Sequence, residues 1–147
     1  MAPKKKVLID ASVFIAASGS ISGGSALILE VCKGKFFTAV TTRKILKEAQ
    51  KNIRKKLPSE SLLYFYREMG CLKPKIVDTP QDLNKYDNII SAKDQHVLAS
   101  AINCRASFLI TLDRKHFFTG EIKNAKLPVT IMTPKEFLEL IRERKFL

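Results

Sequence analysis

The first apolar run of the chain is Val7-Leu8-Ile9, and Asp10 follows it directly. An aliphatic run without alternating polar residues is typical of a strand that is buried on both faces, as in a parallel sheet. A second run of this kind, Ser107-Phe108-Leu109-Ile110-Thr111-Leu112, ends in another acid, Asp113. Both runs therefore predict strands of a parallel sheet, each with a carboxylate at its far end.

Strand and helix patterns alternate through the rest of the chain. Three more strands are predicted at residues 36–40, 75–77 and 129–132, with loops at residues 18–25 and 79–88. Helices are predicted at residues 26–32, at residues 59–69 with Gly70 closing the helix, and from Ser91 to about residue 105. Two more have a cap in the sequence: an amphipathic helix that Thr42 caps and Pro58 ends, and a last helix that begins with the capping box Thr133-Pro134-Lys135-Glu136. This alternation predicts one α/β domain over residues 1–147, with three α/β/α layers on a mainly parallel sheet of about five strands.

The composition is strongly basic. The chain has 147 residues, with 26 Lys and Arg against 14 Asp and Glu, which gives a formal net charge of +12. Residues 33–57 carry nine bases and a single acid, Glu48, and this imbalance predicts a polyanionic partner. The alternative is a helix face that is merely solvated. The predicted contacts to nucleic-acid phosphates are Lys44, Lys47, Lys51 and Lys55.

Several other classes of protein are disfavoured. No apolar run approaches the roughly 20 residues that cross a bilayer, so no membrane segment is expected. Three cysteines, Cys32, Cys71 and Cys104, are odd in number and far apart, which favours a reducing cytoplasm over a disulfide framework. His96 and His116 have no close His or Cys neighbours in the sequence, so both are expected to be surface or half-buried residues rather than zinc ligands.

Two of the acids are expected to share one edge of the sheet. In an open parallel sheet, the functional crevice lies outside the carboxyl ends of the strands. Asp10 and Asp113 follow the carboxyl ends of their predicted strands, so both carboxylates are expected at that edge. For each of them, the alternative is a local role as an Asx turn or a helix N-cap.

Asp94 and Glu48 are two further candidates. Asp94 precedes apolar residues at positions i+3, i+4 and i+7, which places it on the buried stripe of its helix unless it closes a capping box with Ser91. Glu48 borders the apolar stripe of its own helix and is expected to face a cleft, unless it pairs with Lys51. Converging carboxylates repel one another, and a hard divalent ion relieves that repulsion. An acidic focus on a basic molecule favours metal-dependent hydrolysis of phosphodiesters.

In this order, these segments resemble a PIN domain. The resemblance rests on residues 7–15, on Glu48, on residues 94–101 and on residues 109–117. It implies a metal-dependent endoribonuclease that binds Mg²⁺ or Mn²⁺ through the quartet Asp10, Glu48, Asp94 and Asp113. The small polar residues that orient carboxylates and waters would then be Ser12 and Thr111. The resemblance also implies RNA as substrate, 5′-phosphate products and a homodimer. It implies either the toxin of a toxin-antitoxin pair, with a cognate antitoxin protein as partner, or an RNA-processing nuclease.

One position departs from the family pattern, and other functions compete with the nuclease. The family often has Asp-Thr-Asn after the first strand, where this chain has Asp10-Ala11-Ser12; the main alternative is therefore a weakly active or silent module that binds RNA or a protein. A P-loop enzyme is disfavoured because residues 19–25 lack Gly-Lys-Ser/Thr, and a phosphoaspartyl phosphatase because Ser12 stands where a second acid is needed. Residues 19–25 are interpreted as a flap beside the site or as a plain connection.

Overall fold

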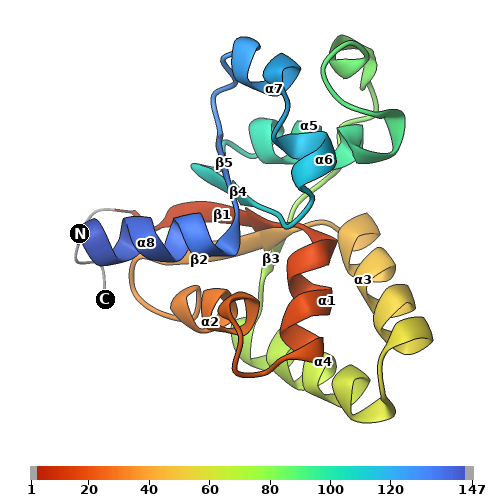
Figure 1. Ribbon diagram of the computed structural model, residues 1–147, viewed down its shortest axis with the longest axis vertical. Coiled ribbons are helices and arrows are strands. Elements are labelled where there is room, and N and C mark those ends of the chain that lie inside the picture. The colour runs from red at the N-terminus through yellow and green to blue at the C-terminus, as the bar shows by residue number, and fades with distance from the viewer. Residues whose placement is uncertain (1–2, 145–147) are drawn as a thin grey trace.

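A computed structural model describes residues 3–144. Its centre is a sheet of five parallel strands in the order β3-β2-β1-β4-β5 (Figure 1). The strands are β1 (Lys5–Ile9), β2 (Phe37–Thr41), β3 (Lys75–Ile76), β4 (Phe108–Ile110) and β5 (Thr130–Met132). Because helices cover both faces, the predicted three-layer α/β/α arrangement on a parallel sheet is confirmed.

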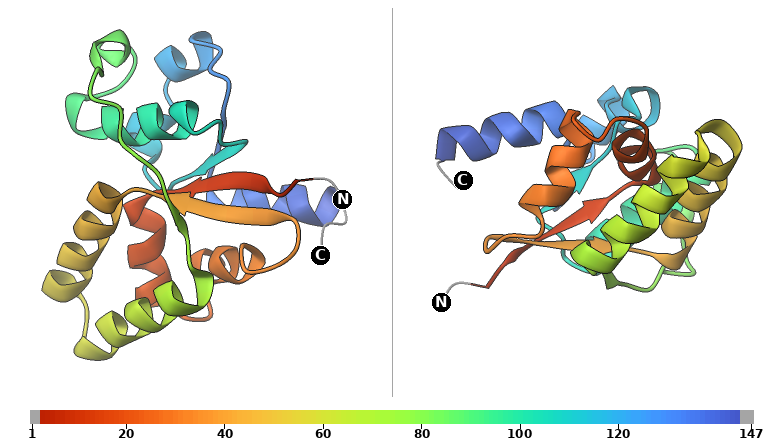
Figure 2. Two further views of the ribbon diagram at one scale, coloured as in Figure 1. Left: turned by 180° about the vertical axis from the view of Figure 1, so that it is seen from behind. Right: turned by 90° about the horizontal axis from the view of Figure 1, so that it is seen from below.

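The helices fall into two groups on opposite sides of the sheet, as the two opposed views in Figures 1 and 2 show. One side carries α1 (Ala11–Gly19), α2 (Gly24–Val31), α3 (Arg43–Lys56) and α4 (Ser59–Leu72). The other side carries the 3-10 turns η1 (Asn84–Tyr86) and η2 (Ala92–Asp94), and the helices α5 (Gln95–Asn103), α6 (Arg114–Phe117) and α7 (Gly120–Asn124). The last helix, α8 (Pro134–Arg144), packs against α2.

The strand order reverses at β1. From β1 the chain winds outward through β2 to β3, then crosses back to β4 on the other side of β1 and continues to β5. Strands β1 and β4 pair with Ile9 opposite Ile110. The N–H of Asp10 donates to the carbonyl of Ile110 at 3.1 Å, so the residues that follow the two strands start side by side. Ligands of open α/β sheets bind at such a reversal.

The interior fits strands that are covered on both faces. Residues 7–9 are fully buried, as their aliphatic sequence predicts. The ring of Phe137 from α8 packs edge-on against Phe37 and Phe108, with centroids 5.1 and 5.2 Å away. These rings anchor the last helix to the sheet.

The sequence does not predict helix α1. Its residues are almost all apolar, and Val13, Phe14 and Ala17 are fully buried between the sheet and the neighbouring helices. A helix that is largely covered by its neighbours has no continuous polar stripe, so its sequence lacks the helical period.

Of the two interpretations of residues 19–25, the plain connection fits the structure and the flap beside the site does not. Because α1 extends to Gly19 and α2 begins at Gly24, the loop expected at residues 18–25 shrinks to residues 20–23. Nine helical residues separate this connection from Asp10, and such a helix spans about 13 Å. The connection therefore lies away from the candidate site.

Several boundaries also differ from the prediction. Helix α4 continues through Gly70, and Lys73 takes the left-handed conformation that ends it, with φ of 47°. The helix expected from Ser91 is divided into η2 and α5, and the strand expected to reach residue 113 ends at Ile110. Helices α6 and α7 are not predicted, because four and five residues are too few to show a period. The loop expected at residues 79–88 contains η1.

Two predicted caps are confirmed. The hydroxyl of Thr42 accepts from the N–H of Ile45 at 3.1 Å and so begins α3. Thr133 and Glu136 make the reciprocal bonds of a capping box, at 3.0 and 3.2 Å. Local sequence signals therefore place both α3 and α8.

The apolar cluster of α4 is divided between the interior and the surface. The sequence run of Leu62, Leu63, Phe65 and Tyr66 could serve the core or a subunit contact, and the core is the favoured interpretation. Phe65 is buried and Leu62 is partly buried, as a core role requires. Leu63 and Tyr66 are 65% and 46% exposed, so part of the cluster remains open to solvent.

Two further properties bear on the class of protein. Among residues 3–144, no single helix is long and apolar enough to cross a membrane, and the bent pair of α1 and α2 meets that test by length and composition alone. The three cysteines carry free thiols.

Candidate active site

Asp10 follows the last residue of β1, and only 7% of its surface is exposed. One carboxylate oxygen accepts from the N–H of Ala11 at 2.8 Å, which makes Asp10 the N-cap of α1. The other oxygen accepts from the hydroxyls of Ser12 and Thr111, at 3.0 and 2.7 Å. Burial raises the pKa of this carboxyl, against the effect of its hydrogen bonds, and the charge of Asp94 adds to the rise.

Thr111 and Ser12 connect the segments that follow β4 and β1. The hydroxyl of Thr111 donates to Asp10 and accepts from the N–H of Asp113 at 3.1 Å. The hydroxyl of Ser12 accepts from the N–H of Leu112 at 3.0 Å. Both predicted supporting residues therefore hold Asp10 and the segment before Asp113 in one arrangement.

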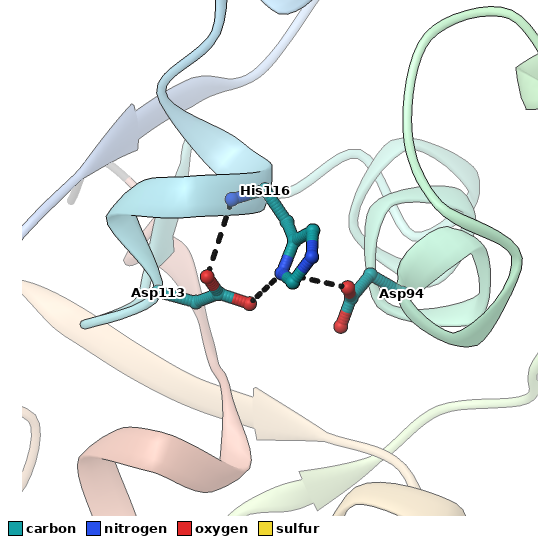
Figure 3. A group of neighbouring side chains, drawn as sticks. All are labelled: Asp94, Asp113 and His116. Carbon is teal, nitrogen blue, oxygen red and sulfur yellow. Dashed lines mark hydrogen bonds and ion pairs between the residues drawn. The ribbon is translucent and has the colours of Figure 1, made fainter.

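Asp113 is joined to Asp94 by the imidazole of His116 (Figure 3). Asp113 is the N-cap of α6, because Oδ1 accepts from the N–H of His116 at 3.2 Å. Its Oδ2 lies 2.8 Å from Nδ1 of His116, and the same nitrogen lies 3.4 Å from Oδ2 of Asp94. Figure 3 shows the ring between the two carboxylates, which come from opposite directions. Residues 94, 113 and 116 thus meet at one point.

The capping box expected at Asp94 is not formed. The hydroxyl of Ser91 makes no capping bond to a backbone N–H. It donates instead to Oδ2 of Asp94 at 2.7 Å. The side chain of Asp94 is 14% exposed, so this bond orients a largely covered carboxylate toward His116.

The side chains of Asp94, Asp113 and His116 are suitable ligands for a divalent cation. One ligand atom from each of Asp94, Asp113 and His116 lies within 4.8 Å of the others. Ligands about 2.1 Å from an octahedral ion lie about 3.0 Å apart on adjacent vertices and about 4.2 Å apart on opposite ones. The two separations from Nδ1 of His116, 2.8 and 3.4 Å, are close to the adjacent spacing. Two carboxylates and an imidazole therefore fit a metal ion with little movement.

Asp10 and Glu48 do not belong to this group of three, which is the one such group found among the described residues. Burial raises the pKa of Glu48, and the charges of Asp10 and Asp94 raise it further, whereas nearby lysines oppose the shift. The acids therefore share one electrostatic neighbourhood. Of the four predicted acids, Asp94 and Asp113 are the two that belong to the tight group.

Glu48 faces a hollow of about 490 Å³, as expected of a residue at the border of its stripe. The lining is largely basic and consists of Lys44, Lys47, Glu48, Lys51, Asn52, Lys55, Lys56, Lys93 and His96. The alternative ion pair between Glu48 and Lys51, both of which the structure describes, is not formed. Glu48 therefore connects the acids with a basic cleft.

The four lysines predicted to contact phosphates, Lys44, Lys47, Lys51 and Lys55, form what we call the lysine face of α3. All four line the hollow of Glu48. Two further hollows along the same helix, of about 450 and 430 Å³, also have walls made by this face. The lysine face thus borders three concave surfaces, one of which also contains Glu48, and its contact with nucleic acid stays a prediction.

The structure contradicts the expectation for His96. This residue is only 4% exposed, and its Nδ1 is buried without a hydrogen-bond partner among the described residues. Burial and the charge of Lys44 lower the pKa of His96, although Asp94 acts in the opposite direction. His96 is therefore a buried side chain rather than a surface or half-buried one.

Sequence reasoning also missed His116 as a possible ligand. Its half-buried side chain fits the expectation, with 26% exposed, but its position beside two carboxylates was not predicted. The available signal was its spacing of three residues from Asp113, which brings two side chains together on a helix. A spacing of three residues indicates a contact only within a helix, and the sequence did not predict α6.

A family model, that of the PIN domain, matches residues 6–115. The match covers about three quarters of the chain and includes Asp10, Glu48, Asp94 and Asp113, while His116 lies one residue beyond it. The chain therefore belongs to the PIN-domain family, whose members are generally nucleases.

Two of the solved structures that match have the same fold. One is VapBC2 from Rickettsia felis, bound to a DNA fragment from its promoter, with a TM-score of 0.60 and 16% identity over 87% of this chain and 98% of that chain. The other is PAE2754 from Pyrobaculum aerophilum, with a TM-score of 0.60 and 13% identity over 96% of this chain and 99% of that chain. Likeness at these identities shows the fold alone. No curated protein matches this sequence significantly.

Proposed function

We propose that this PIN-domain protein is a divalent-metal-dependent endoribonuclease, with residues 1–147 forming one nuclease domain. The observation that carries the proposal is the convergence of Asp94, Asp113 and His116 at the strand reversal, with ligand atoms within 4.8 Å of one another. A cleft lined by lysines adjoins the same acids through Glu48. Hydrolysis of a nucleic acid needs both features, because metal ligands serve the reacting phosphate and basic side chains hold the backbone.

Each acid has a proposed role in holding Mg²⁺ or Mn²⁺. We assign Asp94 and Asp113 as direct ligands, Asp10 as the third carboxylate, and Glu48 as an outer or second-ion ligand. His116 adds a nitrogen donor to this set. A bound divalent ion supplies the positive charge that stabilises the phosphate and the leaving oxygen. The chain itself holds the carboxylates in place, through the hydroxyl groups of Ser12, Ser91 and Thr111.

The proposed reaction is hydrolysis with water as nucleophile. Water attacks phosphorus, the bond from phosphorus to the 3′ oxygen breaks, and one proton of the water ends on that oxygen. One product then carries a 5′-phosphate and the other a 3′-hydroxyl. The lysine face of α3 holds neighbouring phosphates of single-stranded or looped RNA.

Two partners are proposed beyond RNA. The structural likeness to VapBC2 supports a role as the toxin of a toxin-antitoxin pair, with a cognate antitoxin protein as partner. A homodimer is a further prediction of the family resemblance. The exposed side chains of Leu63 and Tyr66 on α4 offer apolar surface for such contacts.

Cleavage of a mixed RNA pool tests the proposed function. The wild type should cleave RNA with Mg²⁺ or Mn²⁺ and not in EDTA, and the new ends should be 5′-phosphates. Asp10→Asn and Asp113→Asn should each lower the rate at least about 100-fold, because several kcal/mol of charge stabilisation depend on the ion they hold. Glu139→Gln, an exposed acid on α8, is the matched control and should cleave as the wild type does.

The main alternative is a silent binding module. One observation favours it: Asp10 and Asp113 are both helix N-caps, so each has a structural role that needs no metal. Equal cleavage by the wild type and both aspartate variants, or no cleavage by any of them, would remove the nuclease assignment.

A further inference from the structure

The hollow that Glu48 lines beside α3 also contains a histidine, His96, among its lysines. His96 belongs to α5 and lines the hollow together with the lysine face of α3. A lysine ammonium group offers charge but little direction, because it ends a flexible stem. The imidazole of His96 is fixed by contrast, since 96% of the residue is buried within the fold.

His96 carries a ring nitrogen without a partner. Nδ1 is buried and accepts or donates no hydrogen bond among residues 3–144. A buried N–H group without an acceptor is rarer and more costly than a buried lone pair without a donor. The favoured form of the ring is therefore neutral, with its proton on Nε2 and its lone pair on Nδ1.

This form presents a hydrogen-bond donor to the hollow. Nε2 has no hydrogen-bond partner among the described residues either, yet it is not among the fully buried atoms, so it is the ring nitrogen that an occupant of the hollow can reach. The six lysines of the lining select a negatively charged occupant. An occupant that is both anionic and rich in acceptor oxygens satisfies the lysines and the Nε2–H group together. A phosphodiester has both properties.

We propose that Nε2–H of His96 donates to a phosphate oxygen of an RNA strand that lies in this hollow. The proposal rests on the proposed function and adds a fixed point to it. Lysines attract the backbone at any register, whereas one rigid donor favours a single phosphate position. Because Glu48, a proposed metal ligand, lines the same hollow, that position is set relative to the acids.

Binding measurements on two variants test the proposal. His96→Phe keeps a buried ring and removes the donor, and His96→Gln restores a donor. Affinity for a short single-stranded RNA, measured by fluorescence anisotropy in EDTA, should fall about tenfold in His96→Phe, the loss expected for one hydrogen bond to a charged group. His96→Gln should recover most of it.

The salt dependence separates this role from a general electrostatic one. His96→Phe should lower affinity equally at every salt concentration, because a neutral donor displaces no counterions. Lys47→Gln should instead lower the slope of log affinity against log salt by about 0.7. Wild-type affinity in His96→Phe, or a change of slope, would overturn the proposal.

Nitrogen-15 NMR of the histidines provides a test that needs no folded variant. In the wild type, His96 should be the Nε2–H tautomer, and its Nε2 and attached proton should shift when the RNA is added in EDTA. An Nδ1–H tautomer, or resonances that do not respond to RNA, would contradict the proposal. Both tests measure binding in EDTA and do not depend on cleavage. If the protein is not a nuclease but this proposal holds, RNA will still bind through His96 and will not be hydrolysed when the metal is present.

Discussion

At the scale of single residues, Asp10 shows how a candidate functional group destabilises the folded state. Its carboxyl is buried, and its pKa is raised above the ordinary value of 3.8. A raised pKa of an acid means that the folded state binds its proton more tightly than the unfolded state does. The charged form therefore destabilises the fold at neutral pH, and this penalty disappears as the pH falls through the folded and then the unfolded pKa.

Asp10→Asn should consequently stabilise the metal-free protein at pH 7. We expect a gain of about 1 kcal/mol, or about 3 °C in melting temperature for a chain of this size. The gain should be smaller at pH 4, because as the pH falls the folded wild type takes up a proton at Asp10 before the unfolded chain does. Thermal melts in EDTA at both pH values check this. A variant that is less stable than the wild type at pH 7, or a gain that is as large at pH 4, would be inconsistent with a strained carboxylate.

At the scale of elements, α3 brings one acid and a row of bases to the same cleft. Replacing Lys47, Lys51 and Lys55 with Gln should weaken RNA binding and lower the salt slope by about 2, because each phosphate contact on a single strand contributes about 0.7. The measurement is RNA affinity across a salt series in EDTA. The matched control removes the same charge from exposed lysines outside α3, on or next to α7 and on α8, with Lys123, Lys126 and Lys135 replaced by Gln. If the two triple variants had equal effects, the lysine face would be a solvated surface without a specific role in RNA binding.

The elements also show where a sequence suffices and where it does not. Strand β1 and helix α3 have unmistakable patterns, an unbroken aliphatic run and an amphipathic stripe after a threonine cap, and both are confirmed. Helix α1 is largely buried and almost wholly apolar, and α6 is a single turn, so neither has a detectable period. The sequence therefore predicts the elements that carry Asp10 and Glu48, but not the turn that carries His116.

At the scale of the whole molecule, the site depends on the strand order. The rule that ligands bind at the carboxyl ends of parallel strands is enough to place Asp10 and Asp113 at one edge. The contact of Asp94 with His116, and the burial of His96 without a partner, depend on how α5 and α6 pack across that edge. Such packing follows from the complete fold, which is why the sequence indicated the acids and missed both histidines.

The most direct test of this account is the structure of the protein crystallised with Mn²⁺, with the ion located by its anomalous scattering. We predict a peak about 2.2 Å from carboxylate oxygens of Asp94 and Asp113, with the ring of His116 as a further ligand and Asp10 and Glu48 facing the same ion or its waters. An ion bound elsewhere on the surface, with these side chains left in their hydrogen-bonded arrangement, would contradict a shared metal centre at the strand reversal.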